Sequence, residues 1–276
     1  MVLFPNAKIN LGLQVTQKRS DGFHNIETIF YPVPLCDALE LVVAGDKKFE
    51  FSSSGIEIPG NKEDNLCIKA WRMLEKDFSL PPVKIHLHKT VPIGAGLGGG
   101  SSDGAFMIKL ISRVFSLELS TGTMEEYARQ LGSDCPFFIQ NQPVFAYGKG
   151  DQFEKLSLDL SGYLMIIVKP DVYISTMDAY AAIKPSTAEV QLPVVISNSI
   201  HQWRHHLSND FEQPVFEKFP SIQHIKSQFY NYGAIYAQMS GSGSAVYGIF
   251  EKETNLKKHF QSFFYWQGRL SGNTDE

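Results

Sequence analysis

The sequence has few cysteines, no excess of basic residues and no long apolar run. Its three cysteines, Cys36, Cys67 and Cys135, are odd in number and far apart, so we expect reduced thiols rather than a disulfide framework. The formal net charge of −4 gives no basic field for nucleic acid or a membrane. No apolar stretch approaches the length that spans a bilayer, and residues 1–6 lack the layout of a signal peptide. We therefore expect a cytoplasmic protein with no nucleic-acid partner and no membrane partner.

The length and the order of patterns predict an α+β protein. A chain of 276 residues can bury a full core and is expected to form two domains, with a boundary near residues 151–160. Alternating strand patterns come first, and helix, strand, glycine loop and helix follow. That order is mixed and differs from strict βαβ alternation. In the second half we expect a buried strand at 164–168, one helix over 215–230, and a final pair of strands at 234–239 and 245–250.

The densest glycine run lies between Pro92 and Asp103, and an apolar segment follows it. Six glycines and two serines fall between Gly94 and Gly104, so the run is a loop rather than a packed element. Residues 101–115 are mostly apolar and predict a buried helix, which Ser101, Ser102 or Asp103 can cap. Bare main-chain N–H groups and the positive end of a helix dipole favour an anion such as a phosphate.

Known nucleotide motifs can be compared with this loop. A Walker A loop needs a lysine before the serine, and Gly100 stands there instead. The dinucleotide fingerprint matches at Gly94, Gly96 and Gly99, with Glu118 near the place of its acidic partner. However, residues 83–89 alternate between apolar and polar, which favours a one-side-solvated antiparallel strand over a buried parallel one. From the loop alone, another nucleotide-binding fold and a purely structural turn both remain open as interpretations of the glycine run.

Two polar patterns near the N-terminus are candidates for a site. In the alternating strand 8–15, Lys8 and Asn10 share one face and can reach the same ligand, although periodicity alone favours a solvated face. Asp21-Gly22 predicts a turn that makes this strand the first half of a hairpin. Phe23 and His24 follow the turn, where packing competes with a ligand contact.

Three later features also admit more than one interpretation. Asp134 stands two residues before a proline and is either a turn residue or a carboxylate close to the glycine loop. Residues 240–244 are either a hairpin turn or a second source of N–H groups for a phosphate. His201 and His205 have the i, i+4 spacing of metal ligands, but no further ligand cluster is near them, so a solvated helix face is expected.

Taken together, five stretches in this order resemble the GHMP kinase superfamily. They are Pro5–Leu11, Asp21–Thr28, Pro92–Asp103, Leu131–Phe138 and Met239–Ser244. The glycine loop is similar throughout the superfamily. The Lys-x-Asn strand followed by Asp-Gly-aromatic-His is similar to the kinases that act on a CDP-linked methylerythritol in the non-mevalonate route to isoprenoids.

The resemblance implies a fold and a reaction. Residues 1–155 would form the ATP-binding domain, ribosomal-protein S5-like, and residues 156–276 a ferredoxin-like α/β sandwich that binds the substrate. The reaction would transfer a phosphoryl group from ATP, with Mg²⁺, to the 2-hydroxyl of the CDP-linked methylerythritol. The family is thus expected to use small-molecule substrates only.

The resemblance also implies roles for single residues. Lys8 and Asp134 would be the catalytic pair, with Asp134 accepting the hydroxyl proton. The expected ATP-binding residues are Asn65, Leu66, Lys89, Pro92, Gly94, Gly96, Leu97, Gly98, Gly99, Gly100, Ser101 and Ser102. The expected substrate-binding residues are Asn10, Phe23, His24, Asp134, Thr176 and Tyr180. No protein ligand for Mg²⁺ is assigned.

Some positions depart from the family pattern. Phe23 stands where tyrosine is usual and keeps a ring for stacking, whereas Gly104 stands where alanine is common. Another small-molecule GHMP kinase, of the homoserine or mevalonate type, is the first alternative. A non-catalytic binding protein is the second, and the acidic net charge and the presence of Lys8 and Asp134 count against it.

Overall fold

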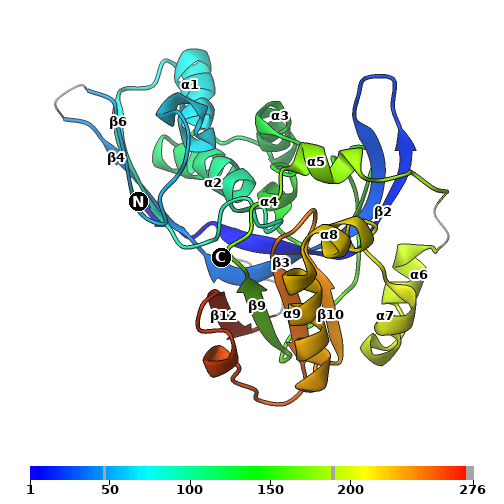
Figure 1. The fold of residues 1–276 in the computed structure, drawn as a ribbon. Coiled ribbons are helices and arrows are strands. Elements are labelled where there is room, and N and C mark those ends of the chain that lie inside the picture. The colour runs from blue at the N-terminus through cyan, green and yellow to red at the C-terminus, as the bar shows by residue number, and fades with distance from the viewer. Residues whose placement is uncertain (46–47, 188–189, 272–276) are drawn as a thin grey trace. The chain divides into compact units, whose positions relative to one another are not determined.

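A computed structural model describes residues 1–45, 48–187 and 190–271 and confirms a mixed α+β architecture (Figure 1). The strands are β1 (Val2–Leu3), β2 (Asn6–Lys18), β3 (His24–Cys36), β4 (Ala38–Val43), β5 (Glu50–Gly55), β6 (Val83–Lys89), β7 (Val144–Tyr147), β8 (Gln152–Lys155), β9 (Leu164–Lys169), β10 (Tyr236–Met239), β11 (Val246–Phe250) and β12 (Phe264–Arg269). The α-helices are α1 (Leu66–Phe78), α2 (Gly99–Val114), α3 (Thr121–Leu131), α4 (Phe137–Gln140), α5 (Thr176–Ala181), α6 (Leu192–Ile196), α7 (Ile200–His206), α8 (Glu212–Lys218) and α9 (Pro220–Asn231). Within the described ranges, no helix combines the length and the apolar character that a membrane crossing needs.

The chain divides into two compact units. Unit 1 contains Met1–Ala7, Leu35–Ile93 and Gly98–Asn141, and unit 2 contains Lys8–Pro34, Gly94–Leu97 and Gln142–Glu276. The glycine loop therefore changes unit after Leu97. The domain boundary expected between residues 155 and 156 stays a prediction.

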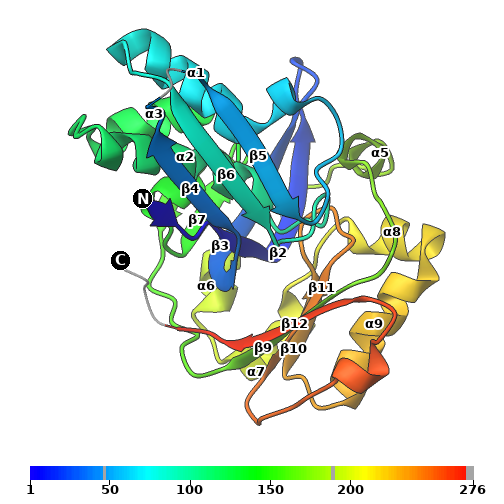
Figure 2. The same ribbon diagram turned by 90° about the vertical axis from the view of Figure 1, so that its left-hand side faces the viewer.

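Unit 1 is built on a four-stranded sheet in the order β1-β4-β6-β5, with helices α1 and α2 on one face (Figure 2). As expected, Val83, Ile85 and Leu87 of β6 are buried while the polar residues between them are more exposed. β6 pairs antiparallel with β4, which supports the argument against a parallel dinucleotide-binding sheet. Its other neighbour, β5, runs parallel to it, and the alternation of β6 does not reveal this.

The two helices of unit 1 that border the glycine loop begin in different ways. Asn65 caps α1, because its side-chain oxygen accepts a 2.9 Å hydrogen bond from the N–H of Cys67. The predicted caps of α2 are wrong: the helix begins at Gly99, and its N-cap is Gly98 in the left-handed region, without a side-chain hydrogen bond. At Gly104 the two helices approach closely, since a Cβ there would lie 2.9 Å from the Cβ of Leu66.

Unit 2 contains two four-stranded sheets, β2-β3-β7-β8 and β10-β11-β9-β12. The apolar run at β9 is fully buried and central in the second sheet, with α9 packed on β10 and β11 (Figure 1). The strand pair β10–β11 is present as predicted. The single helix expected over 215–230 is two helices, because α8 ends at Lys218 and Pro220 starts α9, where a missing N–H costs nothing.

The polar face of β2 is buried, which corrects the expectation of a solvated strand. Lys8 is 4% exposed, Asn10 is 1% exposed and Gln14 is 8% exposed. Periodicity identified the strand correctly but could not reveal that its second face would also be covered. A buried ammonium and a buried amide need specific partners, so this face is a place to look for function.

Candidate active site

The first half of the glycine loop is held by the turn between β10 and β11. The side chain of Ser240 donates a 2.8 Å hydrogen bond to the carbonyl of Gly96, and the N–H of Ala245 donates one of 3.2 Å to the carbonyl of Ala95. A Cβ at Gly96 would lie 1.9 Å from the carbonyl oxygen of Ser240, and φ is +76° there. Only glycine fits this contact. The segment 240–244 is a hairpin turn, as one interpretation expected, and it is also docked on the glycine loop.

Sequence reasoning missed two residues that hold this turn. The side-chain NH₂ of Asn209 donates to the carbonyls of Met239 (2.9 Å) and Gly241 (2.8 Å), and Asn209 is 3% exposed. The carboxylate of Glu212 accepts a 2.9 Å bond from the N–H of Met239 and a 2.6 Å bond from the ammonium of Lys226. Neither residue lies in a recognisable motif. Their role depends on contacts about thirty residues away along the chain.

The second half of the glycine loop opens helix α2 in unit 1. A Cβ at Gly99 would crowd the side chain of Val91 at 2.8 Å, whereas nothing lies within 4 Å of a Cβ at Gly100. The first N–H groups of a helix have no partner within it, and a helix of 16 residues carries a substantial dipole. The open space at Gly100 is therefore a favourable place for an anionic group.

The turn that carries Asp134 lies beside this helix start. The hydroxyl of Ser101 is hydrogen-bonded to the thiol of Cys135, the residue after Asp134. Burial raises the pKa of that thiol to about 12, so Cys135 stays neutral and is not a nucleophile. Within unit 1, the residue after Asp134 is thus in contact with the start of α2, and the role of the Asp134 carboxylate stays a prediction.

Lys8 begins a buried chain of polar contacts in unit 2. Its ammonium donates a 2.7 Å hydrogen bond to Asn10, whose NH₂ donates at 3.0 Å to the hydroxyl of Thr28. The ammonium also lies 4.5 Å from the centre of the Phe30 ring. The main-chain N–H of Lys8 donates at 2.9 Å to the carbonyl of Leu97, so β2 is joined directly to the glycine loop. Lys8 and Asp134 belong to different units, and their pairing stays a prediction.

The predicted aromatic residues lie in unit 2, and not all of them stack on each other. The rings of His24 and Tyr180 are stacked at 4.8 Å with an angle of 18° between their planes. Phe211 meets the Tyr180 ring edge-on at 4.9 Å. Phe23 is 59% exposed, with the ammonium of Lys149 5.3 Å from its ring centre. An exposed ring beside a His–Tyr stack can take up a flat base, but the cytosine contacts stay predictions.

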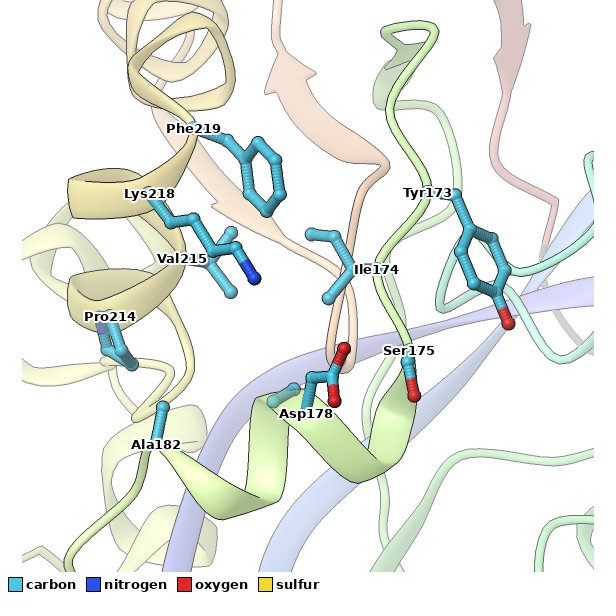
Figure 3. A pocket seen from close by; sticks show the side chains of 10 residues that line it. Tyr173, Ile174, Ser175, Asp178, Ala182, Pro214, Val215, Lys218 and Phe219 are labelled. Atoms are coloured by element: carbon cyan, nitrogen blue, oxygen red, sulfur yellow. The ribbon is translucent and has the colours of Figure 1, made fainter.

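A pocket lies between α5, the helix that contains Thr176 and Tyr180, and α8 (Figure 3). Its volume, including space open to solvent, is about 370 Å³. The carboxylate of Asp178 and the ammonium of Lys218 point into it, above an apolar floor (Figure 3). None of the residues predicted for ATP or substrate binding lines this pocket. Tyr173, which lines the pocket, nevertheless adjoins the glycine loop, because a Cβ at Gly94 would lie 3.0 Å from its ring.

The residues predicted for the adenosine side lie together in unit 1. Asn65 and Leu66 start α1, next to α2. The side chain of Lys89 is 3% exposed, and its ammonium binds the carboxylates of Asp37 and Asp103. The Lys89 ammonium is thus enclosed by protein groups. The main chain of Lys89 ends strand β6, which leads into the glycine loop.

Comparison with known proteins decides the family. Two family models match, "GHMP kinases N terminal domain" over residues 65–149 and "GHMP kinases C terminal" over residues 193–264. A protein of Bacteroides thetaiotaomicron named 4-diphosphocytidyl-2-C-methyl-D-erythritol kinase is 52% identical over 98% of this chain and 100% of its own. The chain belongs to the 4-diphosphocytidyl-2-C-methyl-D-erythritol kinase family of the GHMP kinases.

Other relatives in this kinase family agree. Proteins of the same name from Bacteroides fragilis and Salinibacter ruber are 50% and 36% identical, over 98% and 93% of this chain and 100% and 92% of their own. The crystal structure of a 4-(cytidine 5'-diphospho)-2C-methyl-D-erythritol kinase has a TM-score of 0.84 at 28% identity, covering 99% of this chain and 100% of that one. The mevalonate kinase of Methanococcus jannaschii has a TM-score of 0.72 at 15% identity, covering 99% and 98%, and so shares the fold.

These matches confirm the resemblance to the GHMP kinases and the two-domain α+β fold class expected from the sequence. A kinase of this family uses ATP, which raises the question of whether the chain has its own side-chain ligands for Mg²⁺. No group of three or more metal-binding side chains occurs among the described residues.

Proposed function

We propose that this chain transfers the γ-phosphoryl group of ATP to the 2-hydroxyl of 4-diphosphocytidyl-2-C-methyl-D-erythritol. The observation that carries the proposal is full-length identity of 50–52% to kinases named for that substrate. The glycine loop, docked on a second glycine turn, supports the use of ATP. The homoserine and mevalonate alternatives are not favoured, because solved structures with those names are 12–16% identical to this chain.

ATP phosphates bind over the start of α2. Main-chain N–H groups from Gly99 to Ser101 and the helix dipole attract them, and the absence of a side chain at Gly100 leaves room for them. Asn65 and Leu66 are on the adenosine side. Mg²⁺, when bound, neutralises developing charge on the phosphoryl oxygens.

Asp134 accepts the proton of the attacking hydroxyl, and Lys8 keeps that carboxylate ionised. Phosphoryl transfer is mainly a matter of positioning and charge stabilisation, so one oriented base and one ammonium suffice as protein groups. Asn10 holds the Lys8 ammonium by the 2.7 Å hydrogen bond and offers its amide to the substrate. Phe23 and Tyr180 stack on the cytosine ring, His24 binds its edge, and Thr176 contacts the same substrate.

An acceptor comparison tests the proposal. ADP release by the full-length chain should be measured with ATP and Mg²⁺ and each of three alcohols: 4-diphosphocytidyl-2-C-methyl-D-erythritol, homoserine and mevalonate. We expect turnover with the first only, and the product should carry its phosphate on the 2-hydroxyl by NMR. A preference for either of the other alcohols would reject the proposed substrate but keep the kinase family.

A further inference from the structure

A buried ion cluster lies under the second half of the glycine loop. The ammonium of Lys89 binds the carboxylate of Asp37 and, at 2.7 Å, Oδ2 of Asp103. These three residues are 1–3% exposed. They come from three places in unit 1: the end of β6, the link between β3 and β4, and the first turns of α2. A buried charge is costly unless it is paired, so this arrangement is specific.

The cluster joins the two ends of the loop. Oδ1 of Asp37 accepts hydrogen bonds from the N–H groups of Thr90 and Val91, the latter at 2.8 Å, where the chain enters the loop. Asp103 lies four residues into α2, where the chain leaves it. A Cβ on Gly99 would be 3.0 Å from Nζ of Lys89, so the ammonium sits directly against the first residue of the helix.

The charges of the cluster do not balance if both carboxyl groups are ionised. One ammonium then faces two carboxylates, and the second oxygen of Asp103, Oδ1, is buried with no hydrogen-bond partner in the described part of the chain. Burial, together with the negative charge of Asp37, raises the pKa of Asp103 to about 8 against the opposing effect of Lys89. At neutral pH a proton on Asp103 leaves the cluster neutral.

Among the described residues, two cysteine thiols interact with the charges of the cluster: Cys36, next to Asp37, and Cys67. Burial and the charge of Asp37 raise the pKa of the Cys36 thiol to about 11, so this thiol is neutral near pH 8. The thiol of Cys67 on α1 interacts electrostatically with Asp103, Lys89 and Asp37. Burial raises the pKa of its thiol well above the ordinary value, so Cys67 stays neutral. Within the cluster, the change in charge near pH 8 therefore belongs to Asp103, with Lys89 on β6 and Asp37 on the β3–β4 link as its charged neighbours. Outside the cluster, burial and the charge of Arg113 lower the pKa of Lys109, also on α2, to about 8, so its contribution to a pH dependence has to be measured separately.

We propose that Lys89, Asp37 and Asp103 are positioning residues that hold the glycine loop in the conformation that binds ATP. Lys89 acts on the nucleotide through Gly99 and Val91 rather than by contact of its ammonium. Deprotonation of Asp103 adds a negative charge behind the N-terminus of α2 and weakens the attraction for phosphate. The inference rests on the proposed ATP site and adds to it a support and a pH dependence.

The first test compares Lys89→Met with a control, Lys109→Met. Lys109 lies on α2, the helix that carries Asp103, and its ammonium lies over the Phe106 ring and makes no ion pair with the cluster among the described residues. Hydrogen exchange of residues 94–103 should be measured in the full-length chain without nucleotide. We expect faster exchange in Lys89→Met only, and unchanged exchange would overturn the proposal whatever the protein phosphorylates.

The second test uses Asp103→Asn, which keeps the shape and removes the charge. Binding of a non-hydrolysable ATP analogue should be titrated from pH 7 to pH 9 by calorimetry, with no acceptor alcohol present. Wild-type affinity should fall as the pH rises through about 8, and Asp103→Asn should lack that fall. Lys109→Met, which removes the other group on α2 with a pKa of about 8, should keep it, and its loss in that variant would assign the pH dependence to Lys109 instead. For Lys89→Met at pH 7 we expect binding about tenfold weaker.

The outcomes separate the two proposals. A wild-type chain that binds the analogue but phosphorylates none of the alcohols would reject the proposed reaction and leave the cluster intact. A chain in which Asp103→Asn keeps the wild-type pH dependence would reject the role of Asp103. Should Lys89→Met not fold, Asp37→Asn gives the same loop exchange test with a smaller change, and unchanged loop exchange in that variant would reject the positioning role.

Discussion

Replacing Gly96 by alanine should separate the two glycine turns of unit 2. The added Cβ would lie 1.9 Å from the carbonyl oxygen of Ser240 and 2.8 Å from its carbon, and both are main-chain atoms that cannot turn away. Alanine at a φ of +76° adds about 1–2 kcal/mol of backbone strain. Moving the turns apart also loses two hydrogen bonds, each with a net worth of about 0.5–1.5 kcal/mol.

We therefore expect Gly96→Ala to cost about 2–5 kcal/mol in total. Part of this cost appears as a lower free energy of unfolding in urea. The rest appears as weaker binding of an ATP analogue, because the chain can also relieve the clash by undocking the loop without unfolding. Both quantities should be measured, by urea titration and by calorimetry, on the same preparations.

Gly122→Ala is the matched control. Gly122 lies within α3, and the nearest atom to a Cβ there is the side-chain oxygen of Ser120 at 3.9 Å. Alanine is better than glycine in a helix by about 1 kcal/mol, so this variant should be slightly more stable and bind the analogue normally. The reasoning fails if Gly96→Ala changes both measured free energies by less than about 0.5 kcal/mol, the usual effect of a harmless surface change.

Three further predictions concern the proposed site. Asp134→Asn should lower kcat by about 10²–10⁴-fold with little change in either KM, and steady-state kinetics with near-normal kcat would remove Asp134 as the base. Phe23→Ala should weaken binding of the cytidine substrate by about 1–3 kcal/mol and spare ATP, so an unchanged substrate KM would rule out stacking. Gly100→Ala should raise the free energy of unfolding by about 1 kcal/mol yet weaken ATP binding, because its Cβ fills the space left for phosphate; calorimetry showing normal ATP affinity would contradict this.

Features with a local cause could be predicted from the sequence. The Asn65 cap, the hairpin at Asp21-Gly22 and the alternation of 83–89 each depend on residues within one or two turns of chain, and each is present. The family resemblance depends on short motifs in order, and those too can be read without a structure.

The features that could not be predicted depend on contacts between distant segments. Periodicity alone predicted that Lys8 and Asn10 lie on a solvated strand face, but packing within the folded chain buries both side chains. Helix α2 starts at Gly99, before the three residues that could have capped it, because Gly98 adopts a left-handed conformation that sequence rules do not predict. Asn209 and Lys89 have partners 30 to 52 residues away, at Met239 and Asp37, and no local pattern identifies them.

The docking of Ser240 and Ala245 on residues 95 and 96 has a consequence for any shortened form of the protein. A fragment ending before Tyr236 would contain every glycine between Pro92 and Asp103, and yet it would lack the Ser240 hydroxyl and the Ala245 N–H that bind the carbonyls of Gly96 and Ala95. Grafting the motif alone onto another scaffold would meet the same difficulty. The conformation of this half of the loop thus depends on two segments more than 140 residues apart, and we expect it to form only after the chain has been made through the turn at 240–245.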